Sequence, residues 1–116
     1  MAAVGIAAAG LALAAGPAAA GTNGQQIRFY DNDGTAYSIF VYGKDQSGHW
    51  VGQCFDTPHS TTYINGWWWK ETVSFSVYRT AGCPLDNESA RGNVWVPPSQ
   101  AGDYKDVVFS NGRISG

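Results

Sequence analysis

The sequence predicts an all-β domain, either an antiparallel β-sandwich or a small barrel, and three observations lead to that prediction. Short runs of β-branched and aromatic residues recur along the chain, with Gly, Pro, Asn and Asp between them. Beyond residue 20, no apolar residues recur at helical spacing over two turns. Two cysteines, Cys54 and Cys83, form an even pair of the kind that cross-links small exported domains.

The positions of the apolar runs predict the individual strands. Residues 27–30 and 36–42 are expected to pair as a hairpin around the Asp-Asn-Asp-Gly turn at 31–34. An Asn-Gly pair at 65–66 predicts a turn that leads into the tryptophans. The remaining strands are expected over 49–54, 63–64, 67–79, 93–96 and 104–109. The connections are a turn at 44–48 and loops at 56–62 and 80–93.

Three consecutive tryptophans begin the longest of these strands. Side chains alternate between the two faces of a strand, so Trp67 and Trp69 are expected to share one face of an unbroken strand, and Trp68 the other. The face of Trp67 and Trp69 continues in the apolar residues that follow, Val73, Phe75 and Val77. A thin core does not hold all three indoles, so at least one is expected to cover a second apolar layer or to be accessible to a partner.

The aromatic content of the domain exceeds what its core readily absorbs, because five Trp, six Tyr and five Phe all follow residue 20. Exposed Trp and Tyr are rigid anchors for protein partners and stacking platforms for sugar rings. We therefore expect Trp68 to be the first binding residue, followed by Tyr63 and Trp95, with Trp67 and Trp69 completing the candidate set. Packing of all these rings within the fold is the competing interpretation.

Residues 1–20 have the composition of a secretory signal peptide. They contain no charged residue, and they end in a Gly-Pro pair and an Ala-x-Ala sequence. The basic start of such a peptide is missing, and a single membrane anchor is the less favoured interpretation. We expect residues 21–116 to form one secreted, extracellular, monomeric domain without a membrane span after cleavage.

Charge and cysteine usage narrow the function classes further. The formal net charge is −2 and the seven basic residues are scattered, so a nucleic-acid partner is not expected. A disulfide between Cys54 and Cys83 is favoured over free thiols or half a zinc site, which lacks matching histidines. Closing a loop of this length stabilises a domain by roughly 3–4 kcal/mol in the chain-entropy model.

Catalytic and metal-binding patterns are weak in this sequence. Residues 31–34 suggest a calcium loop, but Ala36 and Tyr42 occupy the positions of the required Gly and Glu. The nearest set to a hydrolase triad lies within a single loop: Asp56, His59 and Ser60. The carboxylates available for glycoside chemistry are scattered: Asp86, Glu88, Asp103 and Asp106. We expect no catalytic residue, no metal and no cofactor.

Two segments resemble a known group of proteins. The first runs from the Cys-Phe pair at 54–55 through Ile-Asn-Gly-Trp-Trp-Trp-Lys at 64–70 to Val-Ser at 73–74, and it is similar to the Streptomyces killer toxin-like proteins. The second, residues 92–115, looks like the closing part of a βγ-crystallin-like Greek-key motif. The resemblance implies a small secreted Greek-key β-sandwich, related to microbial killer toxins, metalloprotease inhibitors and calcium-binding crystallin modules. The calcium ligands of the motif are missing at 111–116, so calcium binding is not carried over.

Three functions follow from these observations. The leading prediction is a killer toxin-like, antimicrobial domain that binds a surface component of microbes without catalysis. The second is a secreted protease inhibitor on the same scaffold, whose loop beside the disulfide offers Pro84, Leu85 and Asp86 to an extracellular protease, with Leu85 entering its pocket. The third is a carbohydrate-binding module in which the tryptophans bind a glycan.

Overall fold

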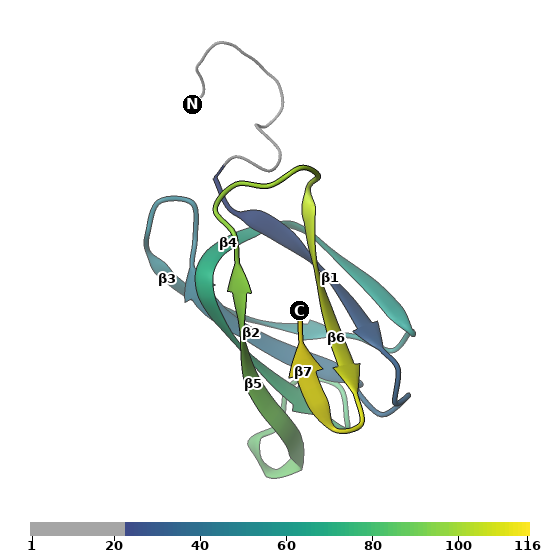
Figure 1. Ribbon diagram of the computed structural model, residues 1–116. Helices are drawn as coiled ribbons and strands as arrows, with labels where there is room; N and C mark the ends of the chain where they lie inside the picture. The colour runs from purple at the N-terminus through teal and green to yellow at the C-terminus, as the bar shows by residue number, and fades with distance from the viewer. Residues whose placement is uncertain (1–22) are drawn as a thin grey trace.

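The computed structural model describes residues 23–116, which form seven β-strands and one 3₁₀ turn (Figure 1). The strands are β1 (Gln25–Asp31), β2 (Ser38–Lys44), β3 (Trp50–Asp56), β4 (Thr61–Tyr78), β5 (Glu88–Val96), β6 (Tyr104–Ser110) and β7 (Arg113–Ser115), and the turn is η1 (Leu85–Asn87). The predicted all-β class is confirmed. The predicted signal peptide lies outside the described residues. No helix that could span a membrane occurs within residues 23–116.

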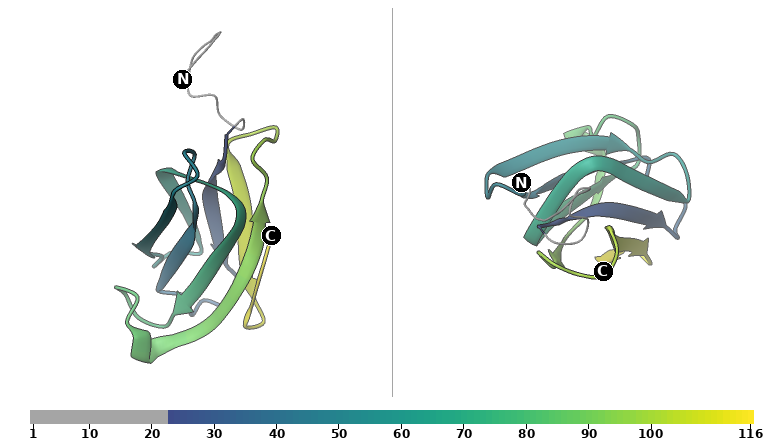
Figure 2. Two further views of the ribbon diagram at one scale, coloured as in Figure 1. Left: turned by 90° about the vertical axis from the view of Figure 1, so that its left-hand side faces the viewer. Right: turned by 90° about the horizontal axis from the view of Figure 1, so that it is seen from above.

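The strands form one curled sheet in which β4 serves both halves (Figure 2). Residues 61–69 of β4 pair with β1, which continues to β6 and β7. Residues 70–78 of β4 pair with β2 on one side and β5 on the other, and β2 continues to β3. All these pairings are antiparallel except that of β1 with β6, which is parallel. The predicted hairpin of residues 27–30 with 36–42 is wrong, because β4 lies between β1 and β2 and pairs with both.

A bulge interrupts β4 at the tryptophans. Ile64 pairs with Ile27 and Trp69 with Gln25, so residues 65–68 lie opposite the single residue between them, Gln26. The predicted turn at 65–66 and the separate strand at 63–64 are therefore wrong, because the chain continues as one strand. An Asn-Gly pair suits a bulge as well as a turn, since both need a residue with positive φ, and Gly66 has a φ of 84°.

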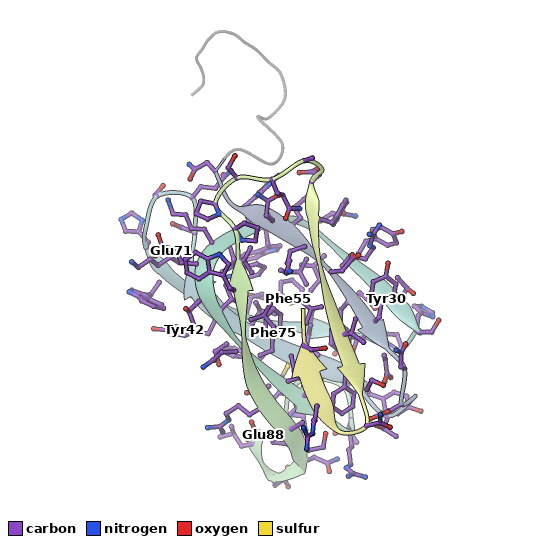
Figure 3. All side chains as sticks on the ribbon, in the orientation of Figure 1. Tyr30, Tyr42, Phe55, Glu71, Phe75 and Glu88 are labelled. Atoms are coloured by element: carbon purple, nitrogen blue, oxygen red, sulfur yellow. A yellow bond between two sulfur atoms is a disulfide. The ribbon has the colours of Figure 1, made fainter. Side chains whose placement is uncertain are left out.

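The core lies inside the curl and is built from alternate residues of the strands. The buried residues of β4 are Ile64, Tyr78 and, on the face that the alternation predicts, Trp69, Val73, Phe75 and Val77. The last four of these pack with side chains from the neighbouring strands: Ile27, Phe29, Ile39, Val41, Val94, Val96, Val107 and Phe109. Figure 3 shows Phe55 and Phe75 inside the curl and Tyr42 at its outer surface.

The last third of the chain departs from the prediction in two places. β5 begins at Glu88 rather than at residue 93, and β7 was not predicted. The first half of β5 carries polar and small residues that hide its strand character, and β7 has only three residues, too few to show an alternation. The predicted disulfide is confirmed: Cys54 on β3 is bonded to Cys83 in the β4–β5 loop, with a Cα–Cα distance of 6.1 Å.

Candidate binding groove

A groove of about 300 Å³ opens between the β2–β3 turn and the bulge of β4. We call it the tryptophan groove. Its lining comprises Asp45, Gln46 and Ser47 from the turn, Val51 from β3, and residues 66–69 from β4. The groove therefore brings together a polar turn and the aromatic segment that the sequence singled out, two parts of the chain that are about 20 residues apart.

The turn wall is held in shape by its own hydrogen bonds. The Oδ1 atom of Asp45 accepts hydrogen bonds from the backbone N–H groups of Ser47 at 2.8 Å and His49 at 2.9 Å. Gly48 supplies the positive φ, 84°, that closes the turn. An aspartate that caps its own turn in this way fixes the direction in which the neighbouring side chains point.

A polar bridge ties the turn to β4. The backbone carbonyl of Gln46 accepts hydrogen bonds from Lys70 Nζ at 3.2 Å and from Asn23 Nδ2 at 3.1 Å. Lys70 Nζ also donates to Asn23 Oδ1 at 3.1 Å. These contacts give the ammonium group of Lys70 two oxygen partners at the margin of the groove.

The aromatic wall is anchored in the core through Trp69. The ring of Trp67 stacks on that of Trp69, with centroids 6.0 Å apart and planes 14° from parallel. Phe55 meets both rings edge-on, at 5.8 and 6.0 Å. Trp69 Nε1 donates to the carbonyl of Val51 at 3.3 Å, which ties the aromatic wall to β3. Trp67 is thus positioned by packing while 36% of its surface stays exposed.

The bulge rests on a glutamine that belongs to β1. Gln26 Oε1 accepts a hydrogen bond from the backbone N–H of Gly66 at 2.6 Å, and Gln26 Nε2 donates to Asp103 Oδ2 at 3.0 Å. Gln26 is buried, so these hydrogen bonds replace those it would make with water. The aromatic wall is therefore held by a hydrogen bond to β1 as well as by the packing of its own rings.

The chemistry of the tryptophan groove is that of a mixed apolar and polar binding surface. Indole rings supply apolar contact, while an amide, a hydroxyl and a carboxylate in the turn supply hydrogen-bonding groups. Asp45 is the one carboxylate in the lining, and its Oδ1 is engaged by the turn itself. A ligand with alternating apolar and hydroxylated surfaces fits this combination.

The five predicted binding residues do not form one surface. Trp67 and Trp68 line the groove, and Trp68 is half-buried. Trp69 also lines it, but the residue is only 1% exposed and belongs to the core. Tyr63 and Trp95 are more than half exposed and lie outside the lining.

Tyr63 belongs to a separate cluster around Arg28. The guanidinium of Arg28 lies over the rings of Tyr63, Tyr30 and Tyr104, at 5.6, 5.7 and 6.0 Å from their centroids. It also donates two hydrogen bonds to the Asp106 carboxylate, at 2.6 and 3.0 Å. These hydrogen bonds to Asp106 raise the pKa of Arg28 above its already high usual value. The cluster is a self-contained cation–π arrangement.

The predicted inhibitor segment follows Cys83 directly and runs into η1. Its residues are Pro84, Leu85 and Asp86. Leu85 is 84% exposed, and the turn that carries it is held by the Cys54–Cys83 bond and by a hydrogen bond from Cys83 N to Ser38 Oγ at 2.9 Å. The segment thus presents an apolar side chain from a restrained turn.

Sequence reasoning missed the polar half of the groove and a second exposed aromatic pair. The sequence predicts the turn at 44–48, but nothing in its composition signals that it faces the tryptophans. Tyr42 and Trp50 stack at 5.4 Å on the outer face of β2 and β3, and their positions on facing strands are the only sequence signal for this pair. Within residues 23–116, no three His, Cys, Asp or Glu side chains gather as a metal site would require.

The chain matches no family model, no curated protein and no solved structure.

Proposed function

We propose that this protein is a secreted, non-catalytic domain that binds a carbohydrate component of the microbial surface in the tryptophan groove. The observation that carries the proposal is the placement of Trp67 and Trp68 beside the polar turn at 45–47. The C–H faces of a sugar ring pack against indole, and its hydroxyl groups pair with carboxylate, amide and hydroxyl side chains. Because both walls are tied down, little ordering is needed when the ligand binds.

The lining of the groove supports binding without hydrolysis. Glycoside hydrolysis uses two carboxyl groups that flank the bond to be cleaved. The groove offers Asp45 alone, and one of its oxygens already accepts two hydrogen bonds from the turn. Retention on the wall of a competing microbe, followed by growth inhibition, is the killer toxin-like activity that the sequence resemblance suggests.

A βγ-crystallin-like Greek-key sandwich is part of this proposal. The all-β sheet curled around one core and the Cys54–Cys83 disulfide support it. The parallel pairing of β1 with β6 and the 18-residue β4 are features that the resemblance did not lead us to expect.

Retention on purified cell-wall polysaccharides tests the proposal. Trp67→Ala and Trp68→Ala are expected to weaken retention about tenfold or more, as truncation of an aromatic anchor in a binding site does. Leu85→Ala is the matched control, because it removes an exposed apolar side chain remote from the groove lining. Retention of the wild-type protein on none of the polysaccharides, or equal retention of all variants, contradicts the proposal. Growth assays with bacteria and fungi then test the antimicrobial part.

A second function, inhibition of an extracellular protease, is favoured by one observation: Leu85 is 84% exposed on a turn restrained by the disulfide. An apolar side chain held out in this way is suited to fill a protease pocket. Titration of thermolysin-like and subtilisin-like proteases, with Leu85→Ala as the variant and Trp68→Ala as its control, separates this function from the first. Inhibition that survives Leu85→Ala, or no inhibition at all, excludes it.

A further inference from the structure

β3 is a free edge of the curled sheet. It stands at the end of the strand order, with β2 as its one neighbour among the described strands, and it lies at the left-hand margin of Figure 1. The margins formed by β5 and β7 instead lie side by side, and a Cβ atom on Gly92 would be 3.2 Å from Cβ of Ile114. Exposed edges in natural proteins are usually shielded by a lysine, a proline or a bulge. β3 has none of these over its seven residues, and its register with β2 is regular throughout.

Two hydrogen bonds at the ends of the β2–β3 ladder show which backbone groups of β3 face the open side. Asp45 N donates to the carbonyl of His49 at 2.8 Å, and Thr57 N donates to the carbonyl of Tyr37 at 2.9 Å. Hydrogen-bonded pairs alternate with non-bonded pairs in an antiparallel ladder, so the odd-numbered residues of β3 pair with β2. The backbone N–H and C=O groups of the even-numbered residues point away from it: Trp50, Gly52, Cys54 and Asp56. Of these, the carbonyl of Cys54 accepts a hydrogen bond from Nε2 of Gln53 in the same chain at 3.4 Å, and pairing with a second strand would replace that hydrogen bond.

We propose that β3 pairs with β3 of a second copy of this chain, antiparallel and around a two-fold axis at Gln53. This register is the one that uses all seven residues of the strand, since moving the axis to either side leaves residues unpaired. It joins Gly52 to Cys54 of the second copy, and Trp50 to Asp56 of the second copy, through the backbone groups that face the open side. The sequence alone suggested a monomer, and the edge leads to a different conclusion.

The side chains of β3 are self-complementary in this register. Asp56 is the only charged residue of the strand, and it meets Trp50 rather than its own copy, so no like charges face each other. Gln53 faces Gln53, and an amide both donates and accepts hydrogen bonds. Val51 faces Phe55, an apolar pair. Gly52 lies opposite Cys54, and the rings of Phe40 and Tyr42 of the same chain fill the place that a side chain at position 52 would take. The absence of like charges across the axis, the amide pair at Gln53 and the apolar pair of Val51 with Phe55 therefore favour a second copy over an unrelated extended peptide.

Sedimentation of the purified protein over a range of concentrations tests the pairing. The wild-type protein is expected to show a monomer–dimer equilibrium. Gln53→Lys and Gln53→Glu, each alone, place like charges opposite each other at the axis and are expected to raise the dissociation constant about tenfold. An equimolar mixture of the two variants is expected to restore dimers, because lysine then faces glutamate. Gln53→Thr is the neutral control and keeps the dimer, and circular dichroism checks that every variant is folded.

Three results would overturn the proposal: a wild-type protein that stays monomeric at millimolar concentration, a dimer that Gln53→Lys leaves unchanged, or a mixture of the charged variants that stays monomeric. A fourth result, a 1:1 complex in which an extended peptide pairs with β3 in place of the second copy, would overturn it as well. Gln53 does not line the tryptophan groove, so the Gln53 variants leave every residue of the groove lining unchanged. Retention on polysaccharide measured with Gln53→Lys therefore separates a failure of the dimer from a failure of carbohydrate binding.

Discussion

Removal of the disulfide is expected to be the most damaging change outside the core. Cys54 and Cys83 are 29 residues apart in sequence, and the chain-entropy relation gives about 3.6 kcal/mol for closing such a loop. For a domain of this size that loss corresponds to a melting temperature lowered by roughly 15–25 °C. The bond also restrains the turn that exposes Leu85, so its loss loosens that turn as well as the unfolded chain.

The assay is urea unfolding of the Cys54→Ala/Cys83→Ala double variant, followed by tryptophan fluorescence. Wild-type protein treated with a reductant is the control, because it loses the cross-link without any change of sequence. Both are expected to lose the same stability, about 3–4 kcal/mol. A loss below about 1 kcal/mol in both would refute the reasoning, since the loop entropy would then be offset elsewhere.

Three further predictions concern the core, the bulge and an ion pair. Trp69→Ala is expected to lower the free energy of unfolding by about 3–5 kcal/mol, because it empties a buried site and removes the hydrogen bond to Val51. Trp95→Ala changes an exposed position and is expected to cost about 0.5 kcal/mol or less in the same urea titration. Gly24→Ala is expected to lower the free energy of unfolding by at least about 1 kcal/mol more than Gly102→Ala does, as measured by thermal unfolding. Both glycines have a φ of 92°, but only at Gly24 would a Cβ atom lie 2.9 Å from the carbonyl oxygen of Trp69. Equal losses of stability in the two variants would contradict the contact. The hydrogen bonds from Arg91 lower the pKa of Glu88. The stabilisation from this pair is therefore present above the unfolded-state pKa of Glu88 and is lost as the pH falls through its lowered folded-state pKa. An NMR titration should show a higher pKa for Glu88 in Arg91→Ala, and an unchanged pKa would contradict the pairing.

Local alternation was sufficient to predict much of the fold. The buried face of β4 at Val73, Phe75 and Val77 follows from a period of two, and Trp69 falls on the same face. The disulfide followed from an even pair of cysteines in a chain with an export-like start. These features depend on residues close in sequence or on simple counting, which is why a single sequence reveals them.

The bulge and the groove depend on contacts that a single sequence does not encode locally. Whether the Asn-Gly pair at 65–66 makes a turn or a bulge is decided by Gln26, 40 residues earlier, whose side chain accepts the N–H of Gly66. The polar wall at 45–47 meets Trp67 only because β4 bends and returns the tryptophans to the end of the β2–β3 hairpin. The parallel pairing of β1 with β6 likewise joins segments about 78 residues apart, as in the contact of Arg28 with Asp106.

The indole N–H signals of the five tryptophans provide the most direct test of carbohydrate binding in the groove. In a ¹H–¹⁵N correlation spectrum recorded during titration with a soluble wall oligosaccharide, we expect the signals of Trp67 and Trp68 to shift in a saturable way, while those of Trp50 and Trp95 stay in place. Shifts confined to Trp50 or Trp95, or no shift at any indole with oligosaccharides from bacterial and fungal walls, would contradict the assignment of the tryptophan groove as the binding site.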